Sequence, residues 1–290
     1  MAKAQNIMSG ILILVLIWFV VRGLPKVNWG TFFASEDFMT NGWKGLFSAS
    51  TLLTYSLLGG TGLIVFSAEA KNPKRDIPMA AAISTIVIAI LFALIGIVAS
   101  GILPLDQVAN QTLGVIANHF LTRPEYIVFM VGGALCATAT TLNGMIGSVT
   151  KPLVMLSYDG WLPKTLGDLH PKYKTPYKYL LVYYIITMLP LFLGVDISAV
   201  SDMTLLGSYT QSALFIFFMR SLPDKFPEQW EKSIFRMPRP IFTVIMWVCF
   251  LAAASNVVGM LTGSDIKTII FNVAFLVVGV LFSVSWYKSG

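Results

Sequence analysis

Eight stretches of mostly apolar residues alternate with short polar segments along this chain of 290 residues. A helix that crosses a bilayer needs about 20 consecutive, mostly apolar residues. The segments between the stretches carry proline, glycine and charge, and none is long enough to form a soluble domain. The pattern therefore predicts an all-α polytopic membrane protein, with a single transmembrane domain over 1–290. Its eight predicted spans are 6–23, 44–68, 77–103, 127–150, 179–195, 203–220, 241–262 and 266–287.

Composition agrees with this prediction, and the charges add an orientation. Hydrophobic residues make up 56% of the chain and charged residues only 12%, whereas about 25% of the residues in soluble proteins are charged. If the N-terminus is cytoplasmic and the spans alternate, 15 of the 20 lysines and arginines fall on the inner side. Cytoplasmic loops carry such an excess of positive charge. We therefore expect a multi-pass protein of the cytoplasmic (plasma) membrane with both termini inside. The net charge of +6 then reflects topology and does not indicate nucleic-acid binding.

The second apolar stretch contains a run of weak helix formers. Gly59, Gly60, Thr61 and Gly62 interrupt it, and each glycine inside a helix costs about 1 kcal/mol relative to alanine. We therefore expect the helix to unwind there. Non-helical backbone at membrane depth survives only where protein covers it or where it lines a cavity, and discontinuous helices build midplane binding sites in secondary transporters. Close helix packing is the alternative reason for such glycines.

Two charged, proline-containing motifs favour the substrate-site interpretation of the glycines over close helix packing. The first follows the glycines, so that 43–78 resembles the sixth helix and following loop of the amino acid–polyamine–organocation (APC) superfamily of permeases, amino acid permease type. A second segment, 147–176, resembles the end of the eighth helix and its loop. The matching residues of the first motif are Glu69, Lys71, Asn72, Pro73, Arg75, Ile77 and Pro78, and those of the second are Asp159, Gly160, Leu162, Pro163, His170, Pro171, Lys172, Thr175 and Pro176.

The register of this resemblance implies helices five to twelve only. The chain would hold the last helix of repeat one, all of inverted repeat two, and two accessory helices of the leucine-transporter-type fold. Nothing in 1–290 matches helices one to four. We therefore expect an N-terminally truncated product, a fragment of a longer reading frame or one part of a split protein, and the sequence does not choose among them.

The resemblance implies a substrate site on the broken sixth helix. In the family, backbone carbonyls there hold the substrate's ammonium group, and an aromatic residue at the position of Tyr55 often acts as an outer gate; an interfacial or core aromatic is the alternative. Most members have a bulky residue and then an acid where this chain has Gly60 and Thr61. Their absence predicts a wider pocket and argues against proton coupling through Thr61. The predicted substrate-binding residues are Tyr55, Ser56, Leu57, Leu58, Gly59, Gly60, Thr61 and Gly62.

Three further polar residues, Thr141, Asn143 and Ser208, are candidates for an ion site or the permeation pathway. In sodium-coupled relatives, oxygen atoms near the positions of Thr141 and Asn143 coordinate the ion. The alternative is that the threonines of this segment bond backbone carbonyls in their own helix. Ser208 belongs to a polar stripe with Tyr209 and Gln211, which either faces the pathway or bonds neighbouring helices.

The predicted function is secondary-active transport of amino acids or related amines by alternating access, carried out by a partial permease that lacks helices one to four. The expected partners are a small-molecule amino acid or amine substrate, a coupling ion (Na+ or H+) or an exchanged amino acid, and the lipid bilayer, with no nucleic acid. A channel or a non-transporting membrane scaffold is the alternative. The sequence contains no hydrolase, protease or nucleotide-binding motif, so we expect no enzyme activity, no cofactor and no metal.

Overall fold

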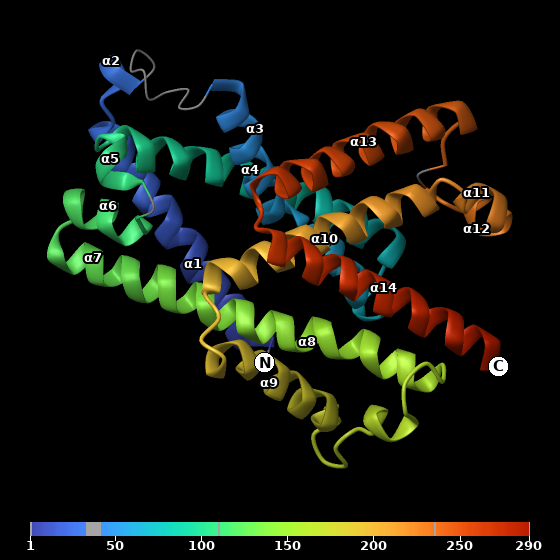
Figure 1. Ribbon diagram of the computed structural model, residues 1–290. Coiled ribbons are helices and arrows are strands. Elements are labelled where there is room, and N and C mark those ends of the chain that lie inside the picture. The colour runs from blue at the N-terminus through green and yellow to red at the C-terminus, as the bar shows by residue number, and fades with distance from the viewer. Residues whose placement is uncertain (1, 33–41, 110, 235, 290) are drawn as a thin grey trace. The chain divides into compact units, whose positions relative to one another are not determined.

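The computed structural model describes residues 2–32, 42–109, 111–234 and 236–289, and nearly all of them are helical (Figure 1). No strand occurs in these ranges, so the prediction of an all-α chain is confirmed. The α-helices are α1 (Ala2–Gly23), α2 (Trp29–Phe32), α3 (Gly42–Leu57), α4 (Pro73–Gly101), α5 (Leu105–Val108), α6 (Leu113–Phe120), α7 (Arg123–Phe129), α8 (Cys136–Tyr158), α9 (Tyr177–Phe192), α10 (Ile197–Met219), α11 (Leu222–Lys225), α12 (Pro227–Glu231), α13 (Arg239–Gly263) and α14 (Ile266–Ser289). The 3-10 helices are η1 (Leu24–Lys26), η3 (Leu58–Glu69) and η5 (Lys164–Gly167), and η4 (Met130–Leu135) is a π-helix.

Six helical stretches among the described residues are long and apolar enough to cross a membrane. Most of the predicted stretch 179–195 lies in the 16-residue helix α9, which is too short to be among the six. The stretch 203–220 lies in α10 except for its last residue, and α10 has 23 residues but is not among the six either. The structure therefore agrees with a polytopic membrane protein, whereas the count of eight spans stays a prediction. The six stretches are Lys3–Lys26, Gly42–Ser67, Pro73–Gly101, Arg123–Tyr158, Arg239–Gly263 and Ile266–Trp286.

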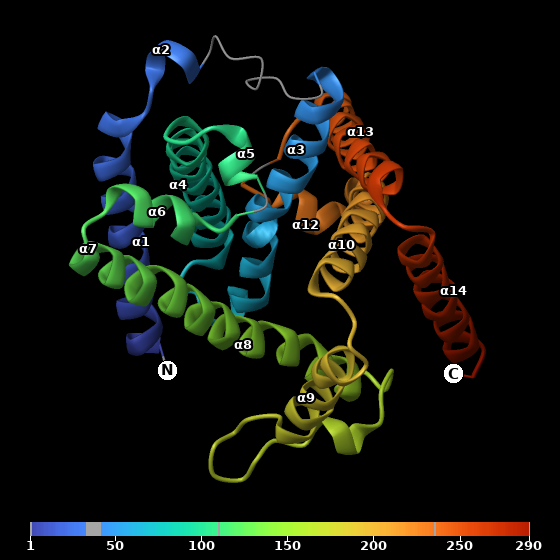
Figure 2. The same cartoon turned by 60° about the vertical axis from the view of Figure 1, so that its left-hand side comes forward.

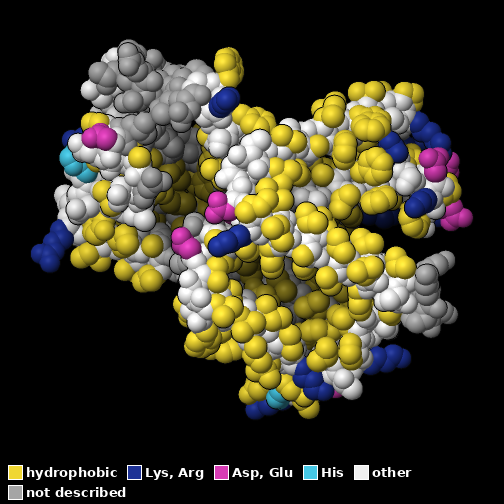
Figure 3. All heavy atoms as spheres, in the orientation of Figure 1, with side chains coloured by type: hydrophobic (Ala, Val, Ile, Leu, Met, Phe, Trp, Pro, Cys, Tyr) yellow, Lys and Arg dark blue, Asp and Glu magenta, His cyan; other side chains and the backbone are white. Residues whose placement is uncertain are grey.

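Large apolar side chains are exposed over most of these helices, as expected for surfaces that face lipid. Ile86 and Ile90 of α4 are 59% and 57% exposed, and Val278 and Leu281 of α14 are 64% and 63% exposed. Figure 3 shows apolar side chains covering much of the visible surface, with charged groups gathered in a few places. Soluble proteins rarely expose apolar patches of this extent, so these faces indicate contact with a bilayer.

Internal packing divides the chain into two units. Unit 1 consists of Met1–Leu46, Leu57–Ala70 and Ile77–Pro152, and unit 2 consists of Phe47–Ser56, Lys71–Asp76 and Leu153–Gly290. The chain passes from unit 2 to unit 1 between Ser56 and Leu57, inside the predicted substrate-binding segment.

Unit 1 has a core in which α1, α4, α6 and α7 meet (Figure 2). Phe19 of α1 is fully buried and stacks on Phe129 of α7, with 5.1 Å between ring centroids. Gly132 of η4 allows α1 to come close, because a Cβ atom there would lie 2.7 Å from Cγ2 of Val15. Between helices in lipid, such van der Waals packing replaces the hydrophobic driving force.

In unit 2, α10 packs along α13 and also contacts α14. Gly207 of α10 lies beside Asn272 of α14, whose Oδ1 would be 3.0 Å from a Cβ atom at position 207. The end of α14 is attached to the loop after α8. Trp286 stacks on Trp161 with 3.9 Å between ring centroids, and its Nε1 donates a hydrogen bond to the carbonyl of Gly160 at 3.0 Å.

Candidate substrate site

The α-helical part of the second span ends where its glycines begin. Helix α3 ends at Leu57, and the chain continues as the 3-10 helix η3 from Leu58 to Glu69. The sequence predicted a non-helical turn at Gly59–Gly62, and the structure corrects this to a change of helix type. The physical reason is that hydrogen bonds from i to i+3 still satisfy the backbone, whereas an open turn would leave polar groups unpaired at membrane depth.

The length of η3 marks it as an unusual element. It has 12 residues, whereas 3-10 runs of more than three or four residues are uncommon, and a 3-10 stretch inside a longer helix often marks a hinge or a strained sequence. Among the described residues, nothing lies within 4 Å of a Cβ atom placed on Gly59 or Gly62. A Cβ atom on Gly60 would be in ordinary contact with Oγ1 of Thr85, at 3.6 Å. Among the described residues, close helix packing therefore does not account for Gly59 and Gly62, whereas for Gly60, which lies against α4, it stays an alternative.

In unit 1, Gly60 faces an open groove between η3 and the first part of α4. The groove has a volume of about 630 Å³. Its lining includes Leu57 and Ile64 beside Gly60, and Ala81 and Thr85 from α4. Of the described side chains that line it, only Thr85 is polar. The groove can therefore accept apolar groups but offers few side-chain partners to a charged one.

In unit 2, Tyr55 lies on a second groove, which is bordered by α3, α9 and α10. This groove has a volume of about 520 Å³, and hydroxyl groups of Thr187, Ser201 and Thr204 line it together with apolar side chains. The side chain of Tyr55 is 37% exposed. Tyr55 is therefore not a buried core aromatic, and its gate role stays a prediction.

The remaining residues of the predicted segment lie along the chain on both sides of the boundary between the units. Ser56, Gly59 and Gly62 are exposed, and Leu57 is half-buried. The side chains of Leu58 and Thr61 lie outside the described part of the structure. The structure thus describes the two halves of the segment separately, Tyr55 and Ser56 in unit 2 and Leu57–Gly62 in unit 1.

One helical turn before Tyr55, α3 is held by two neighbouring helices. Thr51 is 2% exposed, and its backbone carbonyl accepts a hydrogen bond from the hydroxyl of Tyr209 in α10, which is 1% exposed. Helix α13 approaches the same residue at Gly259, where a Cβ atom would lie 2.7 Å from Oγ1 of Thr51. The polar stripe of α10 was expected either to face the pathway or to bond neighbouring helices, and Tyr209 bonds a neighbouring helix. Ser208 is half-buried, and its role in a pathway stays a prediction.

The polar residues of α8 form a small network in unit 1. Asn143 donates a hydrogen bond from Nδ2 to Oε1 of Gln5 in α1 at 2.7 Å, and Nε2 of Gln5 donates to the carbonyl of Thr140 at 3.2 Å. Thr138 and Thr140 bond carbonyls in their own helix, at 2.9 and 2.8 Å, so that alternative is confirmed for these two. Thr141 is exposed. Sequence reasoning missed Gln5, because it precedes the apolar stretch 6–23.

The two motifs that carry the family resemblance form helix boundaries. Asn72 precedes α4, whose first residue is Pro73, and the backbone N–H of Asn72 donates to Oδ2 of Asp76 at 3.1 Å. Proline is favoured at the first helical position because its missing N–H is not needed there. In the second motif, Gly160 has φ +81° directly after the end of α8, a conformation that glycine adopts most easily. Both motifs therefore have a local structural reason.

Comparison with known proteins supplies a family and several relatives. A family model described as "Amino acid permease" matches residues 1–283. The branched-chain amino acid permease BcaP of Bacillus subtilis (strain 168) is 28% identical over 179 residues, which are 60% of this chain and 37% of that protein. The vacuolar cationic amino acid transporter 2 of Arabidopsis thaliana is 23% identical over 228 residues, 76% of this chain and 35% of the relative.

A third relative is named for a substrate that is not an amino acid. The methylthioribose transporter of Bacillus subtilis (strain 168) is 23% identical over 179 residues, 61% of this chain and 38% of that protein. In each of the three pairs, this chain spans less than two fifths of the relative's length.

Proposed function

Because the chain belongs to the amino acid permease family, we propose that it takes part in secondary-active transport of amino acids or related amines across the cytoplasmic membrane. Relatives named as branched-chain and cationic amino acid transporters support this substrate class. The observation that carries the proposal is the change from α-helix to 3-10 helix at Leu57 and Leu58. It lies in the segment where a discontinuous helix would build a binding site in a secondary transporter.

The site works through backbone groups. The last carbonyls of an α-helix carry partial negative charge, so the end of α3 near Tyr55–Gly59 binds the ammonium group of the substrate. Tyr55 closes the site on the outer side. Opening η3 exchanges its internal hydrogen bonds for bonds to the substrate, and the three glycines lower the free energy needed to open it. Thr61 carries no titratable group, so a coupling ion such as Na+ or an exchanged amino acid, rather than a proton bound at this position, drives transport.

Residues 1–290 supply only part of this site. They correspond to helices five to twelve, and the broken helix offers mainly acceptors for the ammonium group. The substrate's carboxylate needs hydrogen-bond donors, because burying it without partners costs several kcal/mol. About 1.4 kcal/mol corresponds to a factor of ten in affinity, so the missing donors would abolish a micromolar or millimolar site. Helices one to four of the family fold supply these donors, and alternating access moves the first repeat against the second.

Reconstitution tests this proposal. Purified residues 1–290 in proteoliposomes are expected to show no saturable uptake of leucine or lysine. Co-expression with a segment that carries helices one to four of a related permease is expected to restore uptake, with counterflow of labelled substrate as the sign of a carrier. Uptake without counterflow would favour a channel. Absence of uptake from both samples would favour a non-transporting scaffold, and robust uptake by residues 1–290 alone would contradict the division of the site.

A further inference from the structure

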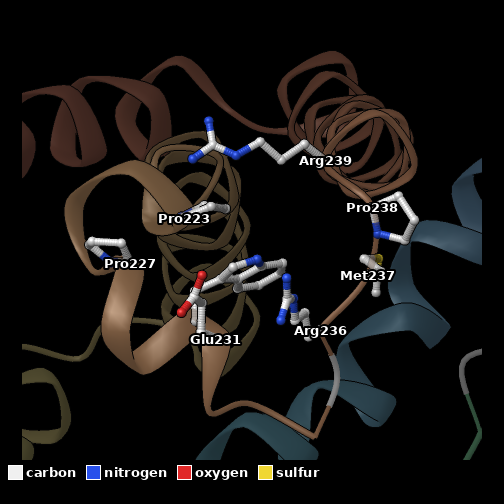
Figure 4. Close-up of a pocket in the computed structure, with 8 residues that line it drawn as sticks. Pro223, Pro227, Glu231, Arg236, Met237, Pro238 and Arg239 are labelled. Atoms are coloured by element: carbon white, nitrogen blue, oxygen red, sulfur yellow. The ribbon is translucent and has the colours of Figure 1, made fainter.

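A charged pocket lies in unit 2, in the connection between α10 and α13 (Figure 4). It has a volume of about 400 Å³ and lies between the short helices α11 and α12 and the segment that leads into α13. Pro223, Trp230 and Met237 supply apolar walls, and Glu231, Arg236 and Arg239 supply charge. None of the predicted substrate-binding residues whose side chains the structure describes lines it.

The charges of the pocket are balanced but not all paired. Arg239 forms an ion pair with Asp224, with 2.6 Å between Nη1 and Oδ1. Among the described residues, Glu231 and Arg236 form no ion pair and both are exposed, and Figure 4 shows both side chains in the lining of the pocket. Within the part of the chain that the structure describes, the pocket thus offers one cation and one carboxylate that have no ion-pair partner. Such an arrangement matches a molecule that carries both charges better than it matches a simple anion.

The position of the pocket along the chain, beside the first residue of a candidate membrane span, indicates the level of lipid headgroups. Helix α13 is one of the six candidate spans and begins at Arg239, so the pocket borders the end of a membrane-spanning segment. Phe226 and Ile234 are 50% and 63% exposed beside it. Trp230 is half-buried and packs on Phe242, with 4.7 Å between ring centroids. Aromatic and basic residues gather at membrane interfaces, and pockets with basic side chains beside spanning helices bind the phosphates of lipid headgroups.

We propose that this pocket binds the zwitterionic headgroup of an aminophospholipid, with the phosphodiester at Arg236 and the ammonium group at Glu231. A guanidinium group matches the geometry of phosphate oxygens through two parallel N–H donors. A primary ammonium has N–H donors for the carboxylate, whereas the quaternary ammonium of choline has none. Phosphatidylethanolamine therefore fits the pocket better than phosphatidylcholine, and phosphatidylglycerol offers Glu231 hydroxyl donors but no cation. This inference does not depend on the transport proposal.

Retention of lipid by the purified 290-residue chain tests the assignment. The protein in mild detergent is incubated with equal amounts of phosphatidylethanolamine, phosphatidylcholine and phosphatidylglycerol, then washed, and the retained lipids are quantified by mass spectrometry. The unsubstituted chain is expected to retain mainly phosphatidylethanolamine. Arg236→Gln is expected to lower this retention about tenfold, because a hydrogen bond to a charged group contributes roughly one to two factors of ten. Glu231→Gln is expected to shift the preference toward phosphatidylglycerol. Lys232→Gln, which removes an exposed cation outside the pocket lining, is the matched control.

Several outcomes would overturn the proposal. Equal losses from Arg236→Gln and Lys232→Gln would indicate a diffuse basic surface, and stronger retention of phosphatidylglycerol by the unsubstituted chain would indicate an anion site. Lower thermal stability of both pocket variants with an unchanged lipid profile would mean that Arg236 and Glu231 support the fold and do not bind lipid. Displacement of the lipid by an equal concentration of water-soluble glycerophosphoethanolamine would assign the pocket to a soluble headgroup. Circular dichroism of each variant checks that the helices remain folded.

Discussion

Tyr209 holds α10 against α3 through a buried hydrogen bond to the carbonyl of Thr51. On its α13 side, the same turn of α3 packs so closely on Gly259 that a Cβ atom there would clash with Thr51 and Phe47. Three helices therefore meet at one residue just before the predicted substrate-binding segment. At the scale of single residues, this contact fixes the part of α3 from which Tyr55 projects.

Replacing Tyr209 with phenylalanine is expected to lower the stability of unit 2 modestly. The change removes one hydroxyl and keeps the ring, so the loss should be about 0.5–1.5 kcal/mol, the usual net contribution of a hydrogen bond. The thermal midpoint in detergent, followed by circular dichroism, measures it. Tyr184→Phe removes a hydroxyl from a side chain that is 61% exposed and is the control. Equal midpoints for the two variants would contradict the role of the bond.

The polar side chains illustrate what the sequence could and could not predict about single residues. The spacing of Ser208, Tyr209 and Gln211 along α10 predicts a polar stripe but not its partners. Whether Tyr209 bonds another helix depends on where α3 lies, and that is a property of the packing. Gln5 carried no sequence signal at all, since an isolated glutamine before an apolar stretch usually lies in the headgroup region.

At the scale of elements, η3 combines a strained helix type with glycines that allow its conformation to change. Its 3-10 hydrogen bonds have poorer geometry than those of an α-helix, and the glycines add conformational freedom. Gly59 and Gly62 have open space around them among the described residues, so nothing there opposes a rearrangement sterically. These are the properties that a segment needs if it opens for a ligand and closes after release.

Gly62→Ala is expected to weaken substrate binding without disturbing the fold. Alanine favours helix over open backbone by about 1 kcal/mol, so affinity should fall about fivefold, given about 1.4 kcal/mol per factor of ten. Ligand-induced thermal stabilisation of the chain co-expressed with helices one to four measures this effect. Gly144→Ala, at a position in α8 that also has open space among the described residues, is the control. Equal affinities for the two variants would contradict a conformational role of η3.

Element boundaries were predicted less well than element positions, and the reasons are local. The helix that begins with α7 starts at Arg123, four residues before the predicted stretch 127–150. The cause is a capping box, in which the side chain of Thr122 accepts a hydrogen bond from the backbone of Glu125 and the side chain of Glu125 accepts one from the backbone of Thr122. In the sequence this pattern is a threonine followed three residues later by a glutamate. Hydropathy alone cannot detect such a start. The short helices α5 and α6 were also missed, because four and eight residues are too few to count as a span.

At the scale of the whole molecule, the number of spans and the orientation of the chain are inferred from different features. The six candidate spans follow from length and composition, whereas the orientation of the chain follows only from where lysine and arginine fall. Fifteen of these 20 residues lie on one side of the predicted alternation, and that bias depends on the number of spans. If α9 or α10 does not cross the membrane, every loop after it changes side. Topology is therefore the property that tests the count of eight directly.

Accessibility of two loop positions distinguishes these arrangements. In a variant whose Cys136 and Cys249 are replaced by alanine, Asp265→Cys is expected to react with an impermeant thiol reagent from outside intact cells, and Lys172→Cys only after the cells are opened. Both positions are exposed, so burial would not hide them. They lie on opposite sides only if an odd number of spans separates them, and the predicted stretches 179–195, 203–220 and 241–262 are three. Labelling of both positions from outside would show that one of the helices α9 or α10 does not cross the membrane, and labelling of position 172 alone would invert the predicted orientation.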